Sequence, residues 1–374
     1  MSTKKKKAGS AASAGQTGKK QTASSKKKKK ANSGEAVASS NPLTPEQQAA
    51  ENARSKKTVR AIATTMTIII LVLIFISLKY IVESYYYAFV LRSETIETAM
   101  ENIDALLYTT SEKEELYELQ AGWDSYRNSR LRDTVTTEAD DGVTLNGYYF
   151  DNGSDVTVIG LHKYDSSGDD DFLYAEYLSD YNLLLPDARL HGSSGGDACS
   201  FGYLEAYDLA CWLEWIDETL GDQTVILIGE GMGAATALIA DELGLLADYD
   251  IAFLVADSPY SSLSAIARYT FWECYYIPTP LTRVVEIYAD HQDDGFLVED
   301  VDALTNAADG SIPVLFLIGT ENEYVPAEQT QALAAAWGGE TVTYTCDSRN
   351  GLIYAEHTDD IQAEIAALID TYVN

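Results

Sequence analysis

Cysteine is scarce in this chain, whose 374 residues include four: Cys199, Cys211, Cys274 and Cys346. No pair has the C-x-x-C spacing of a zinc or dithiol site. Aspartates are abundant, but the runs at 169–171 and 290–294 lack the spacing of a calcium-binding EF-hand loop. We therefore expect solvated acidic loops, no metal and no cofactor. We expect Cys211 to be buried in a helix, and a disulfide among the other three cysteines is an open hypothesis.

Basic residues are also scarce beyond the first 60 positions. Residues 1–60 hold fifteen of the 26 Lys and Arg but three of the 58 Asp and Glu, so their net charge is about +12. The rest of the chain has a net charge of about −44. So acidic a surface repels polyanions, and we expect no nucleic-acid binding by this part. The opposite charges of the two segments indicate two compartments.

An uncharged stretch separates these two segments. Residues 61–78 contain no charged side chain. With the residues that follow, 61–81 is long enough for a transmembrane helix at about 1.5 Å per residue. Four basic residues precede it: Arg54, Lys56, Lys57 and Arg60. Because positive charge favours the cytoplasmic side, we expect a single-pass protein of the cell membrane, with a cytoplasmic N-terminus and an extracytoplasmic C-terminal domain.

The segments on either side of this span have the character of appendages. Residues 1–60 are rich in Lys, Ala, Ser and Gly, so we expect disorder and attraction to anionic lipid headgroups. A tail that only sets the topology is the alternative. Residues 82–130 carry an apolar stripe at 96–107 and a capping-box pattern at Ser111. We expect a helical juxtamembrane stalk whose second helix ends at Gly122.

Apolar runs alternate with amphipathic segments in the remainder of the chain. Two segments with strand-like alternation, 134–137 and 143–150, indicate a hairpin. Short apolar strands then alternate with helical segments, one of them at 172–178. This order indicates an α/β domain over 131–374, with a mostly parallel central sheet and helices on both of its faces. An aromatic-rich insertion at about 259–300 indicates a cap.

Five stretches of this domain follow an order that resembles the α/β-hydrolase superfamily. They are D-G-V-T-L-N-G-Y-Y at 141–149, V-I-G-L-H-K-Y at 158–164, L-P-D-A-R-L-H-G-S-S-G-G-D at 185–197, G-E-G-M-G-A-A-T at 229–236, and the segment 313–326, which ends in V-P. The chain is most similar to membrane-anchored bacterial hydrolases of the serine-aminopeptidase-like type. This resemblance implies an α/β-hydrolase fold with a catalytic serine on a sharp strand-to-helix turn.

The positions that carry the family's chemistry are all changed in this chain. The resemblance implies a serine, a carboxylate and a histidine where the sequence has Gly231, Asn322 and Asn350. Glycine offers no nucleophilic atom, and asparagine neither holds an imidazolium as a carboxylate does nor transfers protons at neutral pH. Glycine also relieves the backbone strain of such a turn. We therefore expect no catalytic residue at these three positions.

The resemblance also implies a pocket at the carboxyl ends of the strands. We expect His162, Tyr164 and Met232 to line it, with the backbone N–H groups of Tyr164 and Met232 where an active relative has its oxyanion hole. These changes predict a module that binds a small ligand or a protein partner and has lost hydrolytic activity. The alternative is an active esterase or peptidase that uses relocated residues, with Ser193, Ser194 and Ser258 as the candidate serines.

Overall fold

The computed structural model describes residues 43–89, 110–170, 172–276, 278–292, 294–348 and 353–374. Contacts divide the chain into two units whose boundary falls after Ile69. Most of the segment expected to be a disordered tail and the apolar stripe at 96–107 lie outside the described residues.

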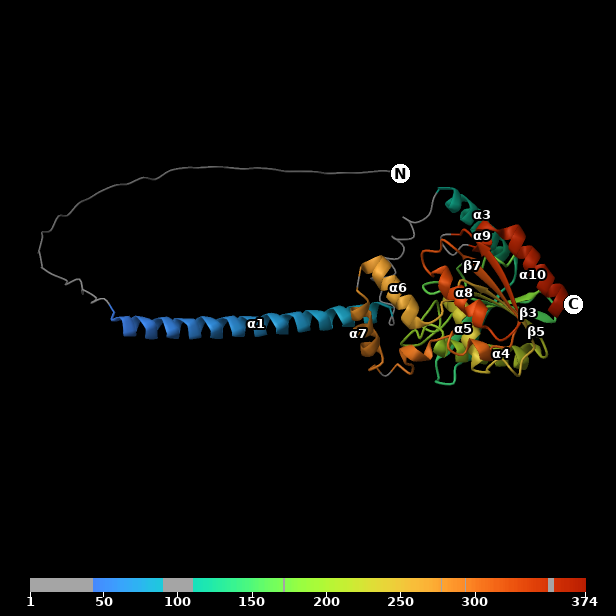
Figure 1. The fold of residues 1–374 in the computed structure, drawn as a ribbon. Helices are drawn as coiled ribbons and strands as arrows, with labels where there is room; N and C mark the ends of the chain where they lie inside the picture. Colours follow the sequence, from blue (N-terminus) through green and yellow to red (C-terminus); the bar gives the residue numbers. More distant parts are fainter. Residues whose placement is uncertain (1–42, 90–109, 171, 277, 293, 349–352) are drawn as a thin grey trace, which may run out of the picture. The chain divides into compact units, whose positions relative to one another are not determined.

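Strands and helices alternate along the second unit (Figure 1). The helices are α1 (Pro45–Phe89), α3 (Thr110–Ser129), α4 (Tyr203–Leu220), α5 (Met232–Glu242), α6 (Leu263–Tyr275), α7 (Thr279–Ala289), α8 (Ala327–Ala336), α9 (Ile353–Glu356) and α10 (Thr358–Tyr372), with short 3-10 turns η1 (Val298–Asp300) and η2 (Ala307–Asp309). The strands are β1 (Asp133–Glu138), β2 (Thr144–Phe150), β3 (Val156–Leu161), β4 (Asn182–Pro186), β5 (Thr224–Glu230), β6 (Ile251–Asp257), β7 (Val314–Gly319) and β8 (Thr341–Cys346).

The helix α1 includes the uncharged stretch of the sequence. Among the described residues it is the one helix long and apolar enough to cross a membrane, over Pro45–Tyr86, and its apolar window is not buried against protein. The helix begins at Pro45, inside the segment 1–60 for which we expect disorder. Residues 46–57 are rich in Glu, Gln, Ala, Lys and Arg, whose high helix propensity extends the helix to this point.

The eight strands form one sheet in the order β1-β2-β4-β3-β5-β6-β7-β8. The pairs β1–β2 and β2–β4 are antiparallel, and the five other pairs are parallel. The predicted hairpin is therefore confirmed, with Thr134 opposite Tyr148. The mostly parallel sheet brings the carboxyl ends of β3, β5, β6 and β7 to one edge, which is where the site lies.

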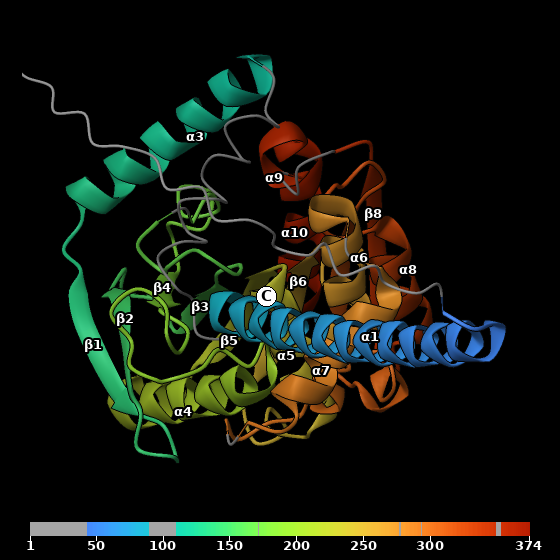
Figure 2. The ribbon, with the colours of Figure 1, turned by 90° about the vertical axis from the view of Figure 1, so that its left-hand side faces the viewer.

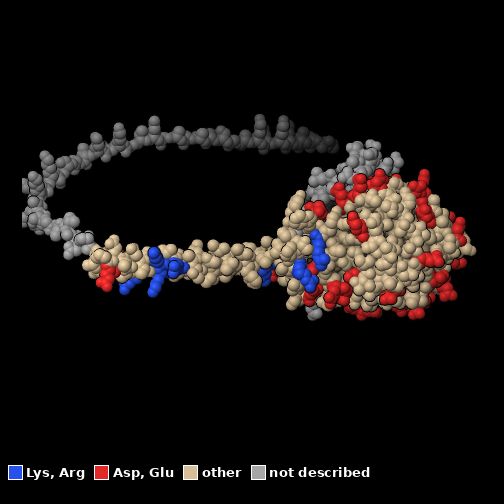
Figure 3. Space-filling model, in the orientation of Figure 1, with Lys and Arg blue, Asp and Glu red and all other residues tan. Residues whose placement is uncertain are grey.

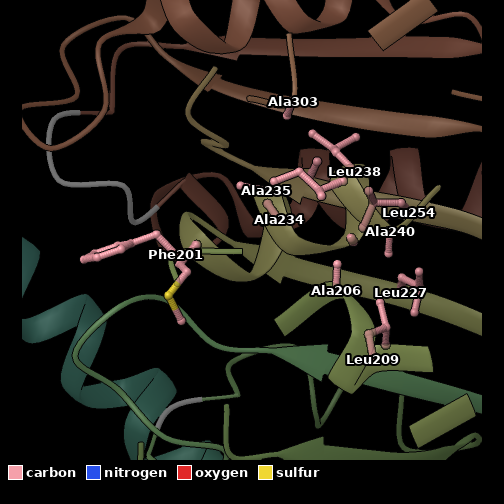
Figure 4. Close-up of a cluster of buried hydrophobic side chains, with 14 of the residues drawn as sticks. Phe201, Ala206, Leu209, Leu227, Ala234, Ala235, Leu238, Ala240, Leu254 and Ala303 are labelled. Carbon is pink, nitrogen blue, oxygen red and sulfur yellow. The ribbon is translucent and has the colours of Figure 1, made fainter. Parts of the chain in front are cut away.

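Helices cover both faces of this sheet, as predicted (Figure 2). Side chains alternate between the faces along each strand. In β5, Leu227 belongs to the core cluster that includes α4, α5 and α8, whereas Ile226 and Ile228 belong to the cluster that includes α9 and α10. Figure 4 shows part of the first cluster, with Leu238 of α5 and Leu254 of β6.

A buried ion pair fixes the loop that follows β4. Arg189 donates hydrogen bonds of 2.8 and 2.6 Å to the two carboxylate oxygens of Asp208 in α4, and one of 2.9 Å to Asp141 in the β1–β2 turn. Asp187, also buried, accepts from the backbone N–H groups of Gly168 and Ser193. The acidic and basic residues of this motif therefore serve the loop's structure.

The segment 172–178, predicted to be helical, forms turns instead. Its hydrogen bonds connect Ala175 N–H to Phe172 O and Leu178 N–H to Tyr174 O, without a regular ladder. Five of the seven side chains are buried, so the segment has no solvent face of the kind that a surface helix needs. Tertiary packing decides its conformation.

The helix α3 continues through Gly122, where we expected it to end. A Cβ at Gly122 would meet Glu176 Oε2 at 3.3 Å, so a small residue suits the contact. Beyond it, Trp123 and Tyr126 are buried against Phe150. Their burial outweighs the cost of about 1 kcal/mol for a glycine inside a helix.

Replacing Gly233 tests the close approach of α5 to the sheet. A Cβ at this position would lie 2.2 Å from the carbonyl oxygen of Leu161 in β3. We expect Gly233→Ala to lower the free energy of unfolding by about 3 kcal/mol or more, because backbone must move. Gly122→Ala is the control, with an expected change from zero to a gain of about 1 kcal/mol. Thermal and urea unfolding by near-UV circular dichroism measure both, and equal effects would contradict the steric argument.

Candidate functional site

The turn between β5 and α5 is the centre of the site. Gly231 caps α5 with φ +50° and ψ −103°, a conformation that side-chain-bearing residues rarely adopt. Its N–H donates to the carbonyl oxygen of Asp257, which fixes the turn against β6. The neighbouring Gly229 and Gly233 have no room for a Cβ, which would come within 2.6 Å of backbone atoms. The strand and the helix therefore make a sharp elbow.

Gly231 differs from the two glycines that flank it. A Cβ built on Gly231 would meet only the Cβ of Lys163, at an ordinary 3.7 Å. A side chain there is limited by backbone strain and not by space. The position at the tip of the elbow can thus hold a serine, and this chain has none there.

A row of buried polar groups lies next to the elbow, at the ends of β6 and β7. Ser258 Oγ donates to Asp257 Oδ1 at 2.8 Å and accepts from Asn322 Nδ2 at 3.1 Å. Asn322 Oδ1 accepts from the backbone N–H groups of Tyr324 and Val325 at 2.8 and 3.0 Å. The residue at the family's acid position therefore closes a turn and holds Ser258.

Electrostatics keep the row close to neutral. Burial raises the pKa of Asp257 well above its usual range, the Glu230 carboxylate raises it further, and Lys163 opposes the shift. The protonated form of Asp257 is therefore favoured in the folded chain. Glu230 lies 3.8 Å from the ammonium group of Lys163. A protonated carboxyl is a poor base, so Asp257 does not activate Ser258 as a histidine would.

A cavity of about 320 Å³ opens over this row. The carboxyl ends of β5, β6 and β7 form its floor, and α6 and α7 of the predicted cap form its wall, together with Tyr85 and Tyr86 from α1. Three residues of its lining, Asp165, Phe201 and Ser258, have φ between +50° and +64° without being glycine. Backbone strain of this kind tends to cluster at binding sites.

One polar atom of the cavity wall lacks a partner. Thr282 is fully buried, and its Oγ1 has no hydrogen-bond partner in the described part of the chain. Leaving a buried hydroxyl unpaired costs about 1–3 kcal/mol. Because Thr282 has no exposed surface, this hydroxyl is covered by protein and is not open to a molecule in the cavity.

The structure brings most of the predicted pocket residues together. Tyr164, Gly231, Met232 and Asn322 all line the cavity. The Tyr164 ring stacks on Phe201 with the centroids 5.1 Å apart. Asn350 lies outside the described residues.

His162 is absent from the cavity's lining. Its Nε2 accepts a hydrogen bond from Ala188 N–H at 2.9 Å, and its Nδ1 lies 2.7 Å from the carbonyl oxygen of Lys163. The neutral tautomer with a proton on Nδ1 satisfies both contacts. His162 therefore joins two loops beside the site.

Sequence reasoning missed Asp257 and Thr282. Asp257 follows the apolar run of β6 directly, and a carboxylate at the end of a buried parallel strand was a usable signal. Thr282 gave none, because its burial depends on how α6 and α7 pack together.

Metal and disulfide chemistry find no support in the described part of the chain. No group of three or more His, Cys, Asp or Glu side chains there could hold a metal ion. No disulfide joins Cys199, Cys211 or Cys346. Cys211 is buried in α4 as predicted, and Cys199 Sγ lies 3.6 Å from Met232 Sδ.

Comparison with known proteins gives distant relatives. No protein-family model matches the chain. The uncharacterised protein YqkD of Bacillus subtilis is 25% identical over 193 residues, which cover 51% of this chain and 62% of that protein. The uncharacterised protein Rv2307c of Mycobacterium tuberculosis is 27% identical over 209 residues, which cover 54% and 66%. The matched regions thus span less than two thirds of either relative.

A solved structure supports the fold directly. The esterase Pf2001 of Pyrococcus furiosus matches with a TM-score of 0.54 and 23% sequence identity, covering 67% of this chain and 96% of that one. The match agrees with the eight-stranded, mostly parallel sheet flanked by helices. The domain has an α/β-hydrolase fold.

The protonation of Asp257 makes stability depend on pH. Because the pKa of Asp257 is raised in the folded chain, the unfolded chain releases this proton at a lower pH, from about 4 upward, than the folded chain does, so the free energy of unfolding falls with rising pH. We expect Asp257→Asn to lose less stability than the wild type between pH 5 and 8. Thermal unfolding of the full chain in detergent measures this. Asp222→Asn, on an exposed turn, is the control, and an equal pH slope in all three proteins would contradict the assignment.

Proposed function

We propose that this chain is a membrane-anchored protein whose α/β-hydrolase-fold domain binds a small molecule without hydrolysing it. The observation that carries the proposal is Gly231, which places no nucleophilic atom at the tip of an elbow that faces a cavity of about 320 Å³. The cavity gives the domain a place to bind a small molecule, whereas the elbow has no nucleophile that could react with it.

The chemistry of the site supports the loss of hydrolysis. No histidine is found among the described residues that line the cavity. Ser258 is the lining serine, and its hydroxyl is hydrogen-bonded to a carboxyl group and to an amide. Acyl transfer needs a nucleophile, a base and a group that orients the base. The second candidate function, an esterase or peptidase that uses Ser258, has no histidine base in the cavity lining that the structure describes.

The cavity favours a particular class of ligand. Its wall carries Leu263, Ile266 and Phe271 of α6 and Val285 of α7, which favour an apolar body. Its floor offers amide and carboxyl groups. We infer a mostly apolar molecule with a hydrogen-bonding end. The alternative within the same proposal is that the domain binds a protein partner, which would cover the cavity.

The anchor and its orientation belong to the same proposal. The basic residues of α1 that precede the apolar stretch favour a cytoplasmic N-terminus, an extracytoplasmic domain and contact of the tail with anionic lipids. The motifs that resemble membrane-anchored, serine-aminopeptidase-like hydrolases support this arrangement. A domain this acidic is expected not to bind nucleic acid.

Labelling with a fluorophosphonate probe tests the loss of hydrolysis. We expect no label on the wild type and none on Gly231→Ser, because the serine alone has no base. The triple variant Gly231→Ser, Asn322→Asp, Asn350→His restores the residue types of the triad, and we expect it to be labelled. Labelling of the wild type that disappears in Ser258→Ala would establish the esterase alternative instead.

A cavity-filling substitution tests binding. Ala267 lines the cavity, whereas Ala335 is exposed on α8. We expect native mass spectrometry of the purified full chain to detect a retained small molecule. Its occupancy should fall about ten-fold, or about 1.4 kcal/mol of affinity, in Ala267→Phe and stay unchanged in Ala335→Phe. Two results would count against the cavity as the binding site: a wild type that retains no small molecule, or an occupancy that Ala267→Phe does not change.

A further inference from the structure

The helix α7 buries polar side chains and exposes apolar ones. Thr282 and Glu286 are 0% and 4% exposed, whereas Val284 and Ile287 are 36% and 45% exposed. A helix on the surface of a water-soluble domain has the reverse arrangement. The outward side of α7 is therefore suited to surroundings less polar than water.

The helix α6 continues the same surface. Arg268 and Trp272 are one helical turn apart and both exposed, and the exposed Tyr276 follows at the same spacing. Arg268 and Arg283 both reach the Glu286 carboxylate, at 3.5 and 2.9 Å, so the two helices present these side chains together. We call this surface the cap face; it comprises Arg268, Trp272, Tyr276, Arg283, Val284 and Ile287.

The chain connects the cap face closely to the apolar stretch of α1. The Tyr85 ring lies 5.3 Å from that of Phe271 in α6, and the Tyr86 ring lies 5.4 Å from that of Tyr288 in α7. The uncharged stretch ends at Leu78, seven residues before Tyr85. Along a helix that is about 10 Å, comparable with the headgroup layer of a bilayer. If the span crosses a membrane, the cap helices are held at headgroup depth.

The composition of the cap face fits that depth. Tryptophan and tyrosine are enriched where a membrane protein crosses the headgroup layer, and arginine pairs with lipid phosphates. The domain as a whole is strongly acidic. Figure 3 shows patches of Asp and Glu scattered over the visible face of the domain, whereas the Lys and Arg of that face gather over α6 and α7. An acidic surface is repelled by anionic lipid, whereas the two arginines of the cap face favour its approach to such a membrane.

We propose that the cap face lies in the headgroup layer of the membrane that α1 spans, with Trp272, Tyr276 and Ile287 against the acyl-chain ends and both arginines toward anionic phosphates. The proposal rests on the membrane anchor proposed above. It is independent of whether the cavity holds a ligand.

Tryptophan quenching in nanodiscs tests this placement. The full chain is reconstituted, one copy per disc, in phosphatidylcholine with phosphatidylglycerol, either unlabelled or brominated on the acyl chains. In a Trp272→Phe background, a tryptophan is introduced at Ile287 or at Val342, which is 39% exposed on β8. A third variant, Phe75→Trp, reports on the anchor itself.

We expect bromolipid to quench the fluorescence that Ile287→Trp adds to this background at least about two-fold more than the fluorescence that Val342→Trp adds. We also expect Trp272→Phe to remove a quenched component from the fluorescence of the wild type. If Ile287→Trp and Val342→Trp are quenched equally while Phe75→Trp is strongly quenched, α1 spans the membrane but the cap face does not contact it. This result would overturn the proposal. No quenching of Phe75→Trp would overturn the anchor as well. If the Ile287→Trp fluorescence became protected from bromolipid quenching only in discs with two copies, the cap face would contact a second copy of the chain instead of lipid.

Discussion

The close approach of α5 to the sheet is the constraint on which the rest of the site depends. A Cβ on Gly229 or Gly233 would meet backbone of α5 or β3 within 2.6 Å. These two positions let the chain leave β5, turn within one residue and enter a helix that packs on the strands it has just left. The turn residue then faces the cavity whatever its side chain is. Packing therefore preserves the shape of the elbow independently of any chemistry performed there.

The same separation between structure and chemistry holds at the acid position. The oxygen of Asn322 accepts two backbone N–H groups and closes the turn after β7. A carboxylate would make these bonds equally well. The Nδ2 group, however, donates to Ser258, which a carboxylate could not do. Asparagine therefore meets the structural demands of the position more fully than an acid, provided that no imidazolium needs to be held.

Periodicity and motif order predicted the sheet, its coverage by helices and the elbow, because each depends on residues close together in the sequence. The prediction of a helix over 172–178 was wrong, because the burial of five of its seven side chains, which no local pattern reveals, decided the conformation. His162 was expected in the pocket on the strength of its position after β3, but its ring is held by Ala188 and Lys163 from neighbouring loops. The environment of Asp257 depends on β5, β6 and Lys163 together, so its protonation could be argued only from the fold.

The three left-handed residues around the cavity have a consequence for how a guest is chosen. Asp165, Phe201 and Ser258 each hold a backbone conformation that costs of order 1 kcal/mol, and the packing around them must offset that cost. These residues are held by the surrounding packing, so the cavity floor has a fixed shape. A floor of fixed shape would favour, under the proposed binding role, a molecule that matches it without rearrangement of the backbone.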